Sequence, residues 1–226
     1  MCGRFSLAAD PSTIAQRFAV TMSTAESAAW TLHYNIAPTK TVVVVGDDGT
    51  RYLTQMRWGL IPSWAKDPAI GNRMINARAE TVATKPAFRV ALRKHRCLVV
   101  ADGFYEWQQR GRAKQPFYIV LKSREAFGFA GVWETWTAPD GEEIKTCTII
   151  TTEANELLKP IHDRMPVILS LQAEVVWLDP SIQDPEKLLP LLKPYPAEEM
   201  EAYPVSRLVN SPQNDFPDII LPIRES

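Results

Sequence analysis

Short apolar runs separated by turn-forming residues make up most of this chain. Residues 41–45 and 51–58 flank the sequence Gly46-Asp47-Asp48-Gly49, which predicts a β-hairpin with a four-residue loop. Further strands are predicted over residues 96–101, 104–107, 116–121, 127–136 and 146–152, the last two of which flank the turn Pro139-Asp140-Gly141. Hairpins therefore dominate the predicted structure.

The predicted helices are short and stand between the hairpins. Asp10-Pro11 is a good N-cap and first-turn pair for a helix that runs to about Phe18. Residues 79–94 are expected to be mostly helical with an interruption at Pro86, and further helices are expected at about 153–159, 171–177 and 185–192. Because helices and strands do not alternate regularly, the pattern predicts an α+β fold with a largely antiparallel, barrel-like sheet.

Length and composition favour one ordinary globular domain. With 226 residues and 46% hydrophobic content, the chain can bury a substantial core. We expect a single domain over 1–226, with a motif-bearing core at about 1–210 and a C-terminal tail at 211–226. No apolar run is long enough to span a membrane, and the first twenty residues lack an apolar leader, so a cytoplasmic protein without a membrane anchor is expected.

The cysteines and charges narrow the possible chemistry. Cys2, Cys97 and Cys147 are odd in number and far apart, and only three histidines are present, so neither a disulfide framework nor a metal site is expected. Cys97 and Cys147 lie in apolar runs and are expected in the core. Residues 57–96 contain nine Lys or Arg against two acids, which suits a phosphate-binding groove, although a solvated helix face has the same composition.

Cys2 directly follows the initiator methionine. If Met1 is removed, residue 2 carries an α-amine and a thiol on adjacent carbons. An α-amine has a pKa of about 7.7 to 8.0, so part of it is nucleophilic at neutral pH and can form a Schiff base with an aldehyde. The thiol can then close a five-membered thiazolidine ring. Position alone leaves open that Cys2 is an ordinary cysteine.

Three segments place polar residues in strand-rich surroundings. Asn76 could orient a nucleophile and Arg78 could bind phosphate if their backbone is extended; in a helix start, Asn76 would be a cap and Arg78 solvated. Glu106 lies between aromatics, where desolvation would raise its pKa, unless it faces the wet side of a strand. His162 has a dense polar neighbourhood and could transfer protons, or it could be structural.

Seven sequence blocks, in order from residue 1 to about 210, resemble the SOS-response-associated peptidase (SRAP) family: M-C-G-R-F, Y-N-I-A-P, W-G-L-I-P-S-W, I-N-A-R-A-E, A-D-G-F-Y-E-W, I-H-D-R-M-P and P-V-S-R-L-V-N. The resemblance implies a protein that recognises abasic sites in single-stranded DNA and attaches itself covalently through an N-terminal cysteine. No cofactor is implied, and we expect a monomer that joins the nucleoid when bound to damaged DNA.

The resemblance also implies roles for individual residues. Cys2 would be the nucleophile, Asn76 would orient it, Glu106 would shuttle protons, and His162 would assist sugar ring opening and Schiff-base chemistry. The implied phosphate contacts are Arg4, Arg78 and Arg164, and the residues implied to line the DNA cleft are Pro38, Trp64 and Thr151. Family members can have two adjacent aromatics where Trp64 is followed here by Ala65, so a smaller stacking platform is expected.

Two other functions remain open from the sequence. An N-terminal-nucleophile amidohydrolase of the glutamine amidotransferase type also begins Met-Cys-Gly, but Arg4 stands where that family usually has an apolar residue. A non-catalytic module that binds single-stranded DNA would use the basic segment and Trp64 and would not need Cys2. Self-cleavage to expose Cys2 is possible but not required, because a methionine aminopeptidase normally removes Met1 before a small residue.

Overall fold

A closed barrel forms the larger part of the fold. The computed structural model describes residues 2–223, and Met1 and the last three residues of the expected tail lie outside the described residues. Within 2–223, five strands pair in the closed order β10-β4-β3-β6-β9-β10. They are β3 (Thr41–Asp47), β4 (Arg51–Trp58), β6 (Arg96–Ala101), β9 (Phe127–Thr137) and β10 (Glu143–Glu153). Only the β4–β10 pair in this barrel is parallel, so the predicted barrel-like, largely antiparallel α+β fold is confirmed.

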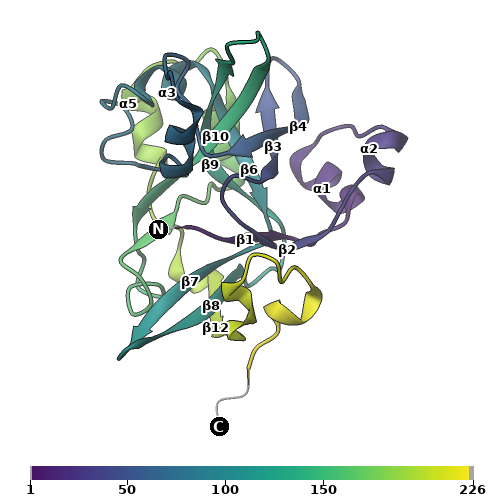
Figure 1. Cartoon of the computed structure of the whole chain (residues 1–226), viewed down its shortest axis with the longest axis vertical. Helices are drawn as coiled ribbons and strands as arrows, with labels where there is room; N and C mark the ends of the chain where they lie inside the picture. The colour runs from purple at the N-terminus through teal and green to yellow at the C-terminus, as the bar shows by residue number, and fades with distance from the viewer. Residues whose placement is uncertain (1, 224–226) are drawn as a thin grey trace.

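A second sheet packs beside the barrel and carries the N-terminal strand (Figure 1). Its order in the described part of the chain is β12-β8-β7-β1-β2, and neighbouring strands are antiparallel. The strands are β1 (Phe5–Leu7), β2 (His33–Ile36), β7 (Gly103–Arg110), β8 (Ala113–Leu121) and β12 (Met200–Pro204). Because β1 pairs with β2 on one side and β7 on the other, the residues that precede β1 are directed along the start of β7.

Two short strands extend the barrel at β10. β5 (Asn76–Arg78) pairs with β10 in parallel, and β11 (Arg164–Pro166) pairs with it antiparallel. Thr151 of β10 is therefore the register partner of both Arg78 and Pro166. Three segments far apart in the sequence meet here at one end of β10.

A glycine lets the chain leave the barrel toward β5. Gly59 follows β4 with a φ of 127°, a conformation that L side chains rarely adopt. A Cβ at this position would lie 2.6 Å from the carbonyl oxygen of Gly71. The two ends of the 59–75 loop therefore lie close together. Leu60 N donates a hydrogen bond to the carbonyl oxygen of Met74, which stands two residues before the start of β5.

The helices are short, as the sequence predicts, but several bounds differ. They are α1 (Pro11–Phe18), α2 (Thr24–Ala28), α3 (Arg89–Lys94), α4 (Leu171–Leu178) and α5 (Pro185–Leu188), with 3₁₀ turns η1 (Pro68–Arg73), η2 (Leu189–Leu191), η3 (Ala197–Glu199), η4 (Arg207–Asn210) and η5 (Pro217–Ile220). The predicted Asp10 cap is confirmed, because its side chain accepts from Thr13 N. The predicted helix at 171–177 is also confirmed.

Three predicted helices need correction. The 79–94 helix is restricted to Arg89–Lys94, since turns occupy the residues around Pro86. The 153–159 helix is absent: β10 runs to Glu153, and turns follow it. The 185–192 helix ends at Leu188 and continues as a 3₁₀ turn, where Pro190 has no N–H to donate.

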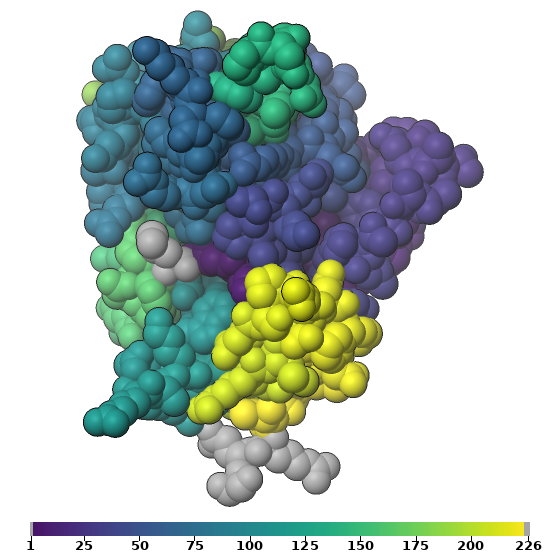
Figure 2. Space-filling model, in the orientation of Figure 1, coloured from purple at the N-terminus to yellow at the C-terminus, as the bar shows by residue number. Residues whose placement is uncertain are grey.

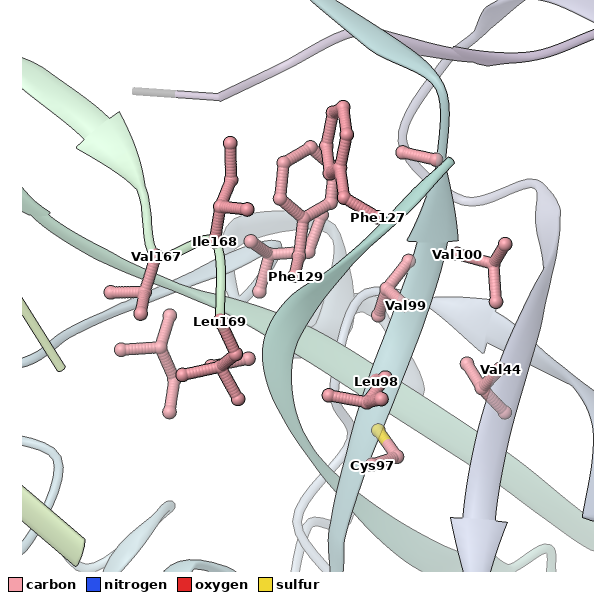
Figure 3. Packing of buried hydrophobic residues seen from close by; sticks show 14 of the residues in the cluster. Val44, Cys97, Leu98, Val99, Val100, Phe127, Phe129, Val167, Ile168 and Leu169 are labelled. Atoms are coloured by element: carbon pink, nitrogen blue, oxygen red, sulfur yellow. The ribbon is translucent and has the colours of Figure 1, made fainter. Parts of the chain in front are cut away.

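The main core fills the barrel and the space between the barrel and its neighbouring elements. Figure 3 shows Cys97, Leu98 and Val99 of β6 close to Val44, Phe127 and Phe129, with 167–169 packing from the side. Cys97 and Cys147 are fully buried, which confirms their predicted place in the core. The β-rich scaffold around the N-terminal segment is thus rigidly packed.

The segment after β12 packs against the second sheet. The Asp215 carboxylate accepts hydrogen bonds from the backbone N–H groups of Tyr34 and Asn35, and Ile219 is fully buried. In Figure 1 this yellow segment lies beside β2 and β8. Among residues 2–223, no helix is long and apolar enough to cross a membrane.

Candidate nucleophile and DNA site

Cys2 lies at the junction of the two sheets, just before β1. Arg4 O accepts from Tyr105 N at 3.0 Å, which continues the β1–β7 pairing toward the N-terminus. The side-chain amide of Asn76 donates to Cys2 O at 2.8 Å. Cys2 is completely buried, and burial raises the pKa of its thiol, with the Glu106 carboxylate raising it further. The thiol is therefore protonated at neutral pH.

Asn76 reaches Cys2 because its backbone is extended. Residues 76–78 form β5, so the helix-start alternative for Asn76 and Arg78 is wrong. Side chains two positions apart on a strand point to the same face, which places the amide and the guanidinium on one side of β5. The Oδ1 atom of Asn76 is buried without a hydrogen-bond partner among the described residues, so an acceptor is available beside Cys2.

Glu106 lies on β7 with 2% of its surface exposed, so the alternative that places it on the wet face of a strand is wrong. Burial raises its pKa, and the nearby His162 acts in the opposite direction. Glu106 also acts electrostatically on the Cys2 thiol. A carboxyl group whose pKa is raised keeps its proton to a higher pH than an exposed Glu does, and it can transfer that proton to a neighbouring group.

His162 precedes β11 and is partly exposed, with 30% of its side chain accessible. Arg164 N donates to its Nδ1 atom at 3.0 Å, and the Asp163 carboxylate lies 3.0 Å from the same atom. Nδ1 thus has a partner in both protonation states: it accepts from Arg164 when unprotonated and donates to Asp163 when protonated. These contacts restrain the His162 imidazole at the start of β11.

The three arginines implied as phosphate contacts have different surroundings. Arg78 is exposed, and within 2–223 its guanidinium makes no hydrogen bond or ion pair. The guanidinium of Arg164 donates to both oxygens of Glu80 and to Thr151 O. Arg4 is more firmly held: it donates to Asn35 Oδ1, Val209 O and Asn210 O.

The residues implied to line the cleft are spread over the surface and interior. Thr151 is fully buried, and its Oγ1 atom lies 3.4 Å from Arg164 Nη2. Pro38 is half-buried in the turn after β2. Trp64 is 61% exposed and borders an open hollow of about 480 Å³ that Lys66 and Arg73 also line. No hydrogen bond in the described part of the chain links Pro38 or Trp64 to Cys2.

The basic segment 57–96 is divided between structural and surface roles. Arg96 is 7% exposed and donates to backbone carbonyls of Leu92, Arg93, Trp177 and Asp179, so it cannot belong to a phosphate groove. In Figure 2 the deep purple N-terminal segment lies in a hollow below the blue surface of this region and above the yellow C-terminal segment.

A separate hollow lies away from the predicted catalytic residues. This hollow, of about 510 Å³, is lined by residues that include Trp30, Leu53 and Val43 and by none of the four predicted catalytic residues. Within 2–223, no group of three or more His, Cys, Asp or Glu could hold a metal ion.

Sequence reasoning missed the contacts of Glu80 with Arg164 and of Asn210 with Trp107 and Arg4. Glu80 ends the I-N-A-R-A-E block, and an acid two residues after Arg78 is a sequence signal for a contact between an acid and an arginine. Asn210 has a side-chain oxygen that accepts from Trp107 Nε1 at 2.8 Å, and its carbonyl accepts from Arg4. No local pattern could have shown this contact, since 103 residues separate Asn210 and Trp107.

The fold and this site define a class of protein with a barrel-based α+β scaffold that holds a buried cysteine near the N-terminus against an amide and a carboxyl group. The chain belongs to the SOS response associated peptidase (SRAP) family, whose sequence model matches residues 1–212. It is 49% identical over 222 residues to a Bacillus subtilis protein named abasic site processing protein YoqW, with 97% of this chain and 99% of that protein covered.

Two more distant proteins agree with this membership. Abasic site processing protein HMCES of Gallus gallus is 38% identical over 201 residues, which cover 78% of this chain and 59% of the chicken protein. A crystal structure of a protein from Bacteroides thetaiotaomicron superposes with a TM-score of 0.89 at 31% identity, covering 99% of this chain and 100% of that one.

Proposed function

We propose that this protein recognises abasic sites in single-stranded DNA and forms a covalent adduct with them through the amine and thiol of Cys2, after Met1 is removed. The observation that carries the proposal is the position of Cys2. Its carbonyl oxygen accepts a hydrogen bond from Asn76, and the charge of Glu106 acts on its thiol. The names of the YoqW and HMCES relatives support an abasic site as the substrate.

The amine reacts first in the proposed sequence. Its nitrogen bonds to the aldehyde carbon of the ring-opened deoxyribose, giving a carbinolamine, which loses water to become a Schiff base. Glu106 in its protonated form supplies the proton that lets hydroxide leave as water, because burial raises the pKa of this carboxyl group. His162, with a partner at Nδ1 in either protonation state, transfers the proton needed for ring opening.

The thiol acts second. Its sulfur bonds to the former aldehyde carbon, and its proton moves to the imine nitrogen, leaving a secondary amine in a thiazolidine ring. Because burial raises the pKa of the Cys2 thiol, little thiolate is present to compete with the amine for the aldehyde. Ring closure removes the imine that β-elimination would require, so crosslinking exceeds lyase activity.

Asn76 and the arginines position the reactants in this proposal. The Asn76 bond to the Cys2 carbonyl restrains the aminothiol with respect to β5. Arg78 on the same face of β5 is exposed and without an ion pair in the described chain, so it is available to a backbone phosphate. Self-cleavage of Met1 is not needed, because a methionine aminopeptidase can expose Cys2.

A denaturing gel tests the proposal. The mature protein is mixed with a single-stranded oligonucleotide that contains one abasic site, then heated in denaturant and separated. We expect a heat-stable shifted band that is absent with Cys2→Ala and with a tetrahydrofuran site, which lacks the aldehyde. Binding without a stable band would instead indicate a non-catalytic module, and glutamine hydrolysis without either would indicate an amidohydrolase.

A further inference from the structure

The Nη1 and Nη2 atoms of Arg164, which can bind a phosphate, are hydrogen-bonded to the carboxylate of Glu80. Arg164 Nη1 lies 2.6 Å from Glu80 Oε1, and Nη2 lies 3.0 Å from Oε2, so two parallel hydrogen bonds join the side chains. Carboxylates and phosphates bind arginine in this same bidentate way. Glu80 therefore occupies the position that a phosphate would take on this end of the guanidinium.

The other bidentate face of Arg164 is closed as well. Nη2 also donates to Thr151 O at 2.6 Å, and Nε is buried without a hydrogen-bond partner among the described residues. Only 14% of the Arg164 side chain is exposed, against 53% of the Glu80 side chain. Glu80 is thus the partner that can move away, whereas Thr151 O is part of β10 and cannot.

The charge of Glu80 acts on two cations of the proposed DNA surface. The hydrogen bond from Arg164 lowers the pKa of the Glu80 carboxyl group, and the charge of Arg78 lowers it further. Glu80 is therefore ionised at neutral pH and lies close to both arginines. Its negative charge opposes a phosphate at either one.

We propose that Glu80 is a specificity-determining residue that competes with DNA phosphate for Arg164. This inference rests on the proposed function, because it takes Arg164 as a phosphate contact. A strand must displace Glu80 to reach Arg164, so reversible binding to every strand is weakened. Retention then depends on the covalent bond to Cys2, which forms only where an aldehyde is present, and the contrast between damaged and intact strands increases.

The test compares Glu80→Gln with Glu153→Gln. Glu153 is exposed and is the register partner of Arg164 on β10, but no ion pair joins the two in the described chain. Both variants remove one negative charge near Arg164, and only Glu80→Gln breaks the ion pair. Equilibrium binding to a single strand with a tetrahydrofuran site is measured over a series of salt concentrations, so no covalent step contributes.

We expect Glu80→Gln to bind about twofold to fivefold more tightly, the equivalent of breaking an exposed ion pair. The slope of log K against log salt should steepen by about 0.7, the value for one additional phosphate contact on a single strand. Glu153→Gln should leave the slope unchanged. In an Arg164→Gln background, Glu80→Gln should no longer steepen it.

Two results would overturn the inference. If Glu80→Gln and Glu153→Gln change the affinity and the salt slope equally, the loss of any nearby negative charge explains the change, and Glu80 does not compete with phosphate for Arg164. If Glu80→Gln melts at the wild-type temperature but binds more weakly, Glu80 orients Arg164 instead of blocking it. The denaturing gel separates these outcomes from failure of the proposed function, because wild-type adduct formation is measured without any substitution at Glu80.

Discussion

The side-chain amide of Asn76 donates a 2.8 Å hydrogen bond to the carbonyl oxygen of Cys2. This bond ties β5 to the N-terminal segment across 74 residues of sequence. It places Cys2 beside the end of β10, where β5 and β11 also meet. Cys2, the proposed nucleophile, is therefore held against the barrel, although it precedes the first strand.

Loss of this bond should slow adduct formation more than it affects folding. Asn76→Ala removes one neutral hydrogen bond, which contributes about 1 kcal/mol to the free energy of unfolding. We expect the single-turnover rate with abasic DNA to fall by about tenfold to a hundredfold, as when a reactant is misplaced by about 1 Å. Asn72→Ala, which loses only a bond from Arg57, is the control. An unchanged rate in Asn76→Ala would show that the bond is structural.

Glu106→Gln should separate stability from activity. The pKa of Glu106 is raised above its ordinary value of 4.5, so the folded protein binds more protons than the unfolded chain above that pH. The free energy of unfolding should therefore decrease as the pH rises from 4.5 through the pKa of Glu106 in the folded protein. In Glu106→Gln this decrease should be smaller, so the variant should be more stable than the wild type at pH 7. Adduct formation should nevertheless be slower. Urea unfolding at several pH values and a timed gel measure the two effects.

The Cys2 thiol should react slowly with iodoacetamide at neutral pH. Burial and the Glu106 carboxylate raise its pKa, which reduces the thiolate that alkylation requires. Glu106→Gln should speed alkylation of Cys2 without changing that of Cys147, whose pKa is raised to about 12 by burial alone. Mass spectrometry of each cysteine follows both rates. Equal rates at Cys2 with and without Glu106 would exclude the electrostatic contribution and leave access as the cause.

Arg78→Ala should weaken reversible binding to any single strand. The Arg78 guanidinium is exposed and has no ion-pair partner in the described chain, so its loss removes about one phosphate contact. The slope of log K against log salt should decrease by about 0.7 for intact and tetrahydrofuran strands alike. Thermal melting should be unaffected. Binding with the wild-type slope would refute a phosphate contact at this position.

Arg4→Ala should instead lower stability. Its guanidinium donates to Asn35 Oδ1, Val209 O and Asn210 O, which joins the N-terminal segment to η4. Hydrogen bonds from a charged group contribute about 1.5 to 3 kcal/mol each, and Asn35 Oδ1 would be left without a donor. We expect a lower urea midpoint than for Arg78→Ala, measured side by side. Equal midpoints for the two variants would show that the Arg4 contacts contribute little.

Local patterns in the sequence determined much of the fold. The hairpins at 41–58 and 127–152 could be predicted because their strands and turns are adjacent, so all the needed information is local. The helix after Asp10 could be predicted for the same reason, since its cap is set by Asp10 and Pro11. Seven motif blocks in the sequence indicate the SRAP family, whose model matches residues 1–212, and the position of Cys2 directly after Met1 suggests the aminothiol chemistry without establishing it.

Only the tertiary structure decided how the motifs meet. β5 and β11 are three residues each and exist because β10 supplies their hydrogen bonds, so no local pattern predicts them. The expected helix at 153–159 is absent because pairing with β11 extends β10 to Glu153. Likewise, the sequence shows Arg4, Arg78 and Arg164 as equivalent cations, and contacts with residues far along the chain leave only Arg78 unpaired in the described structure.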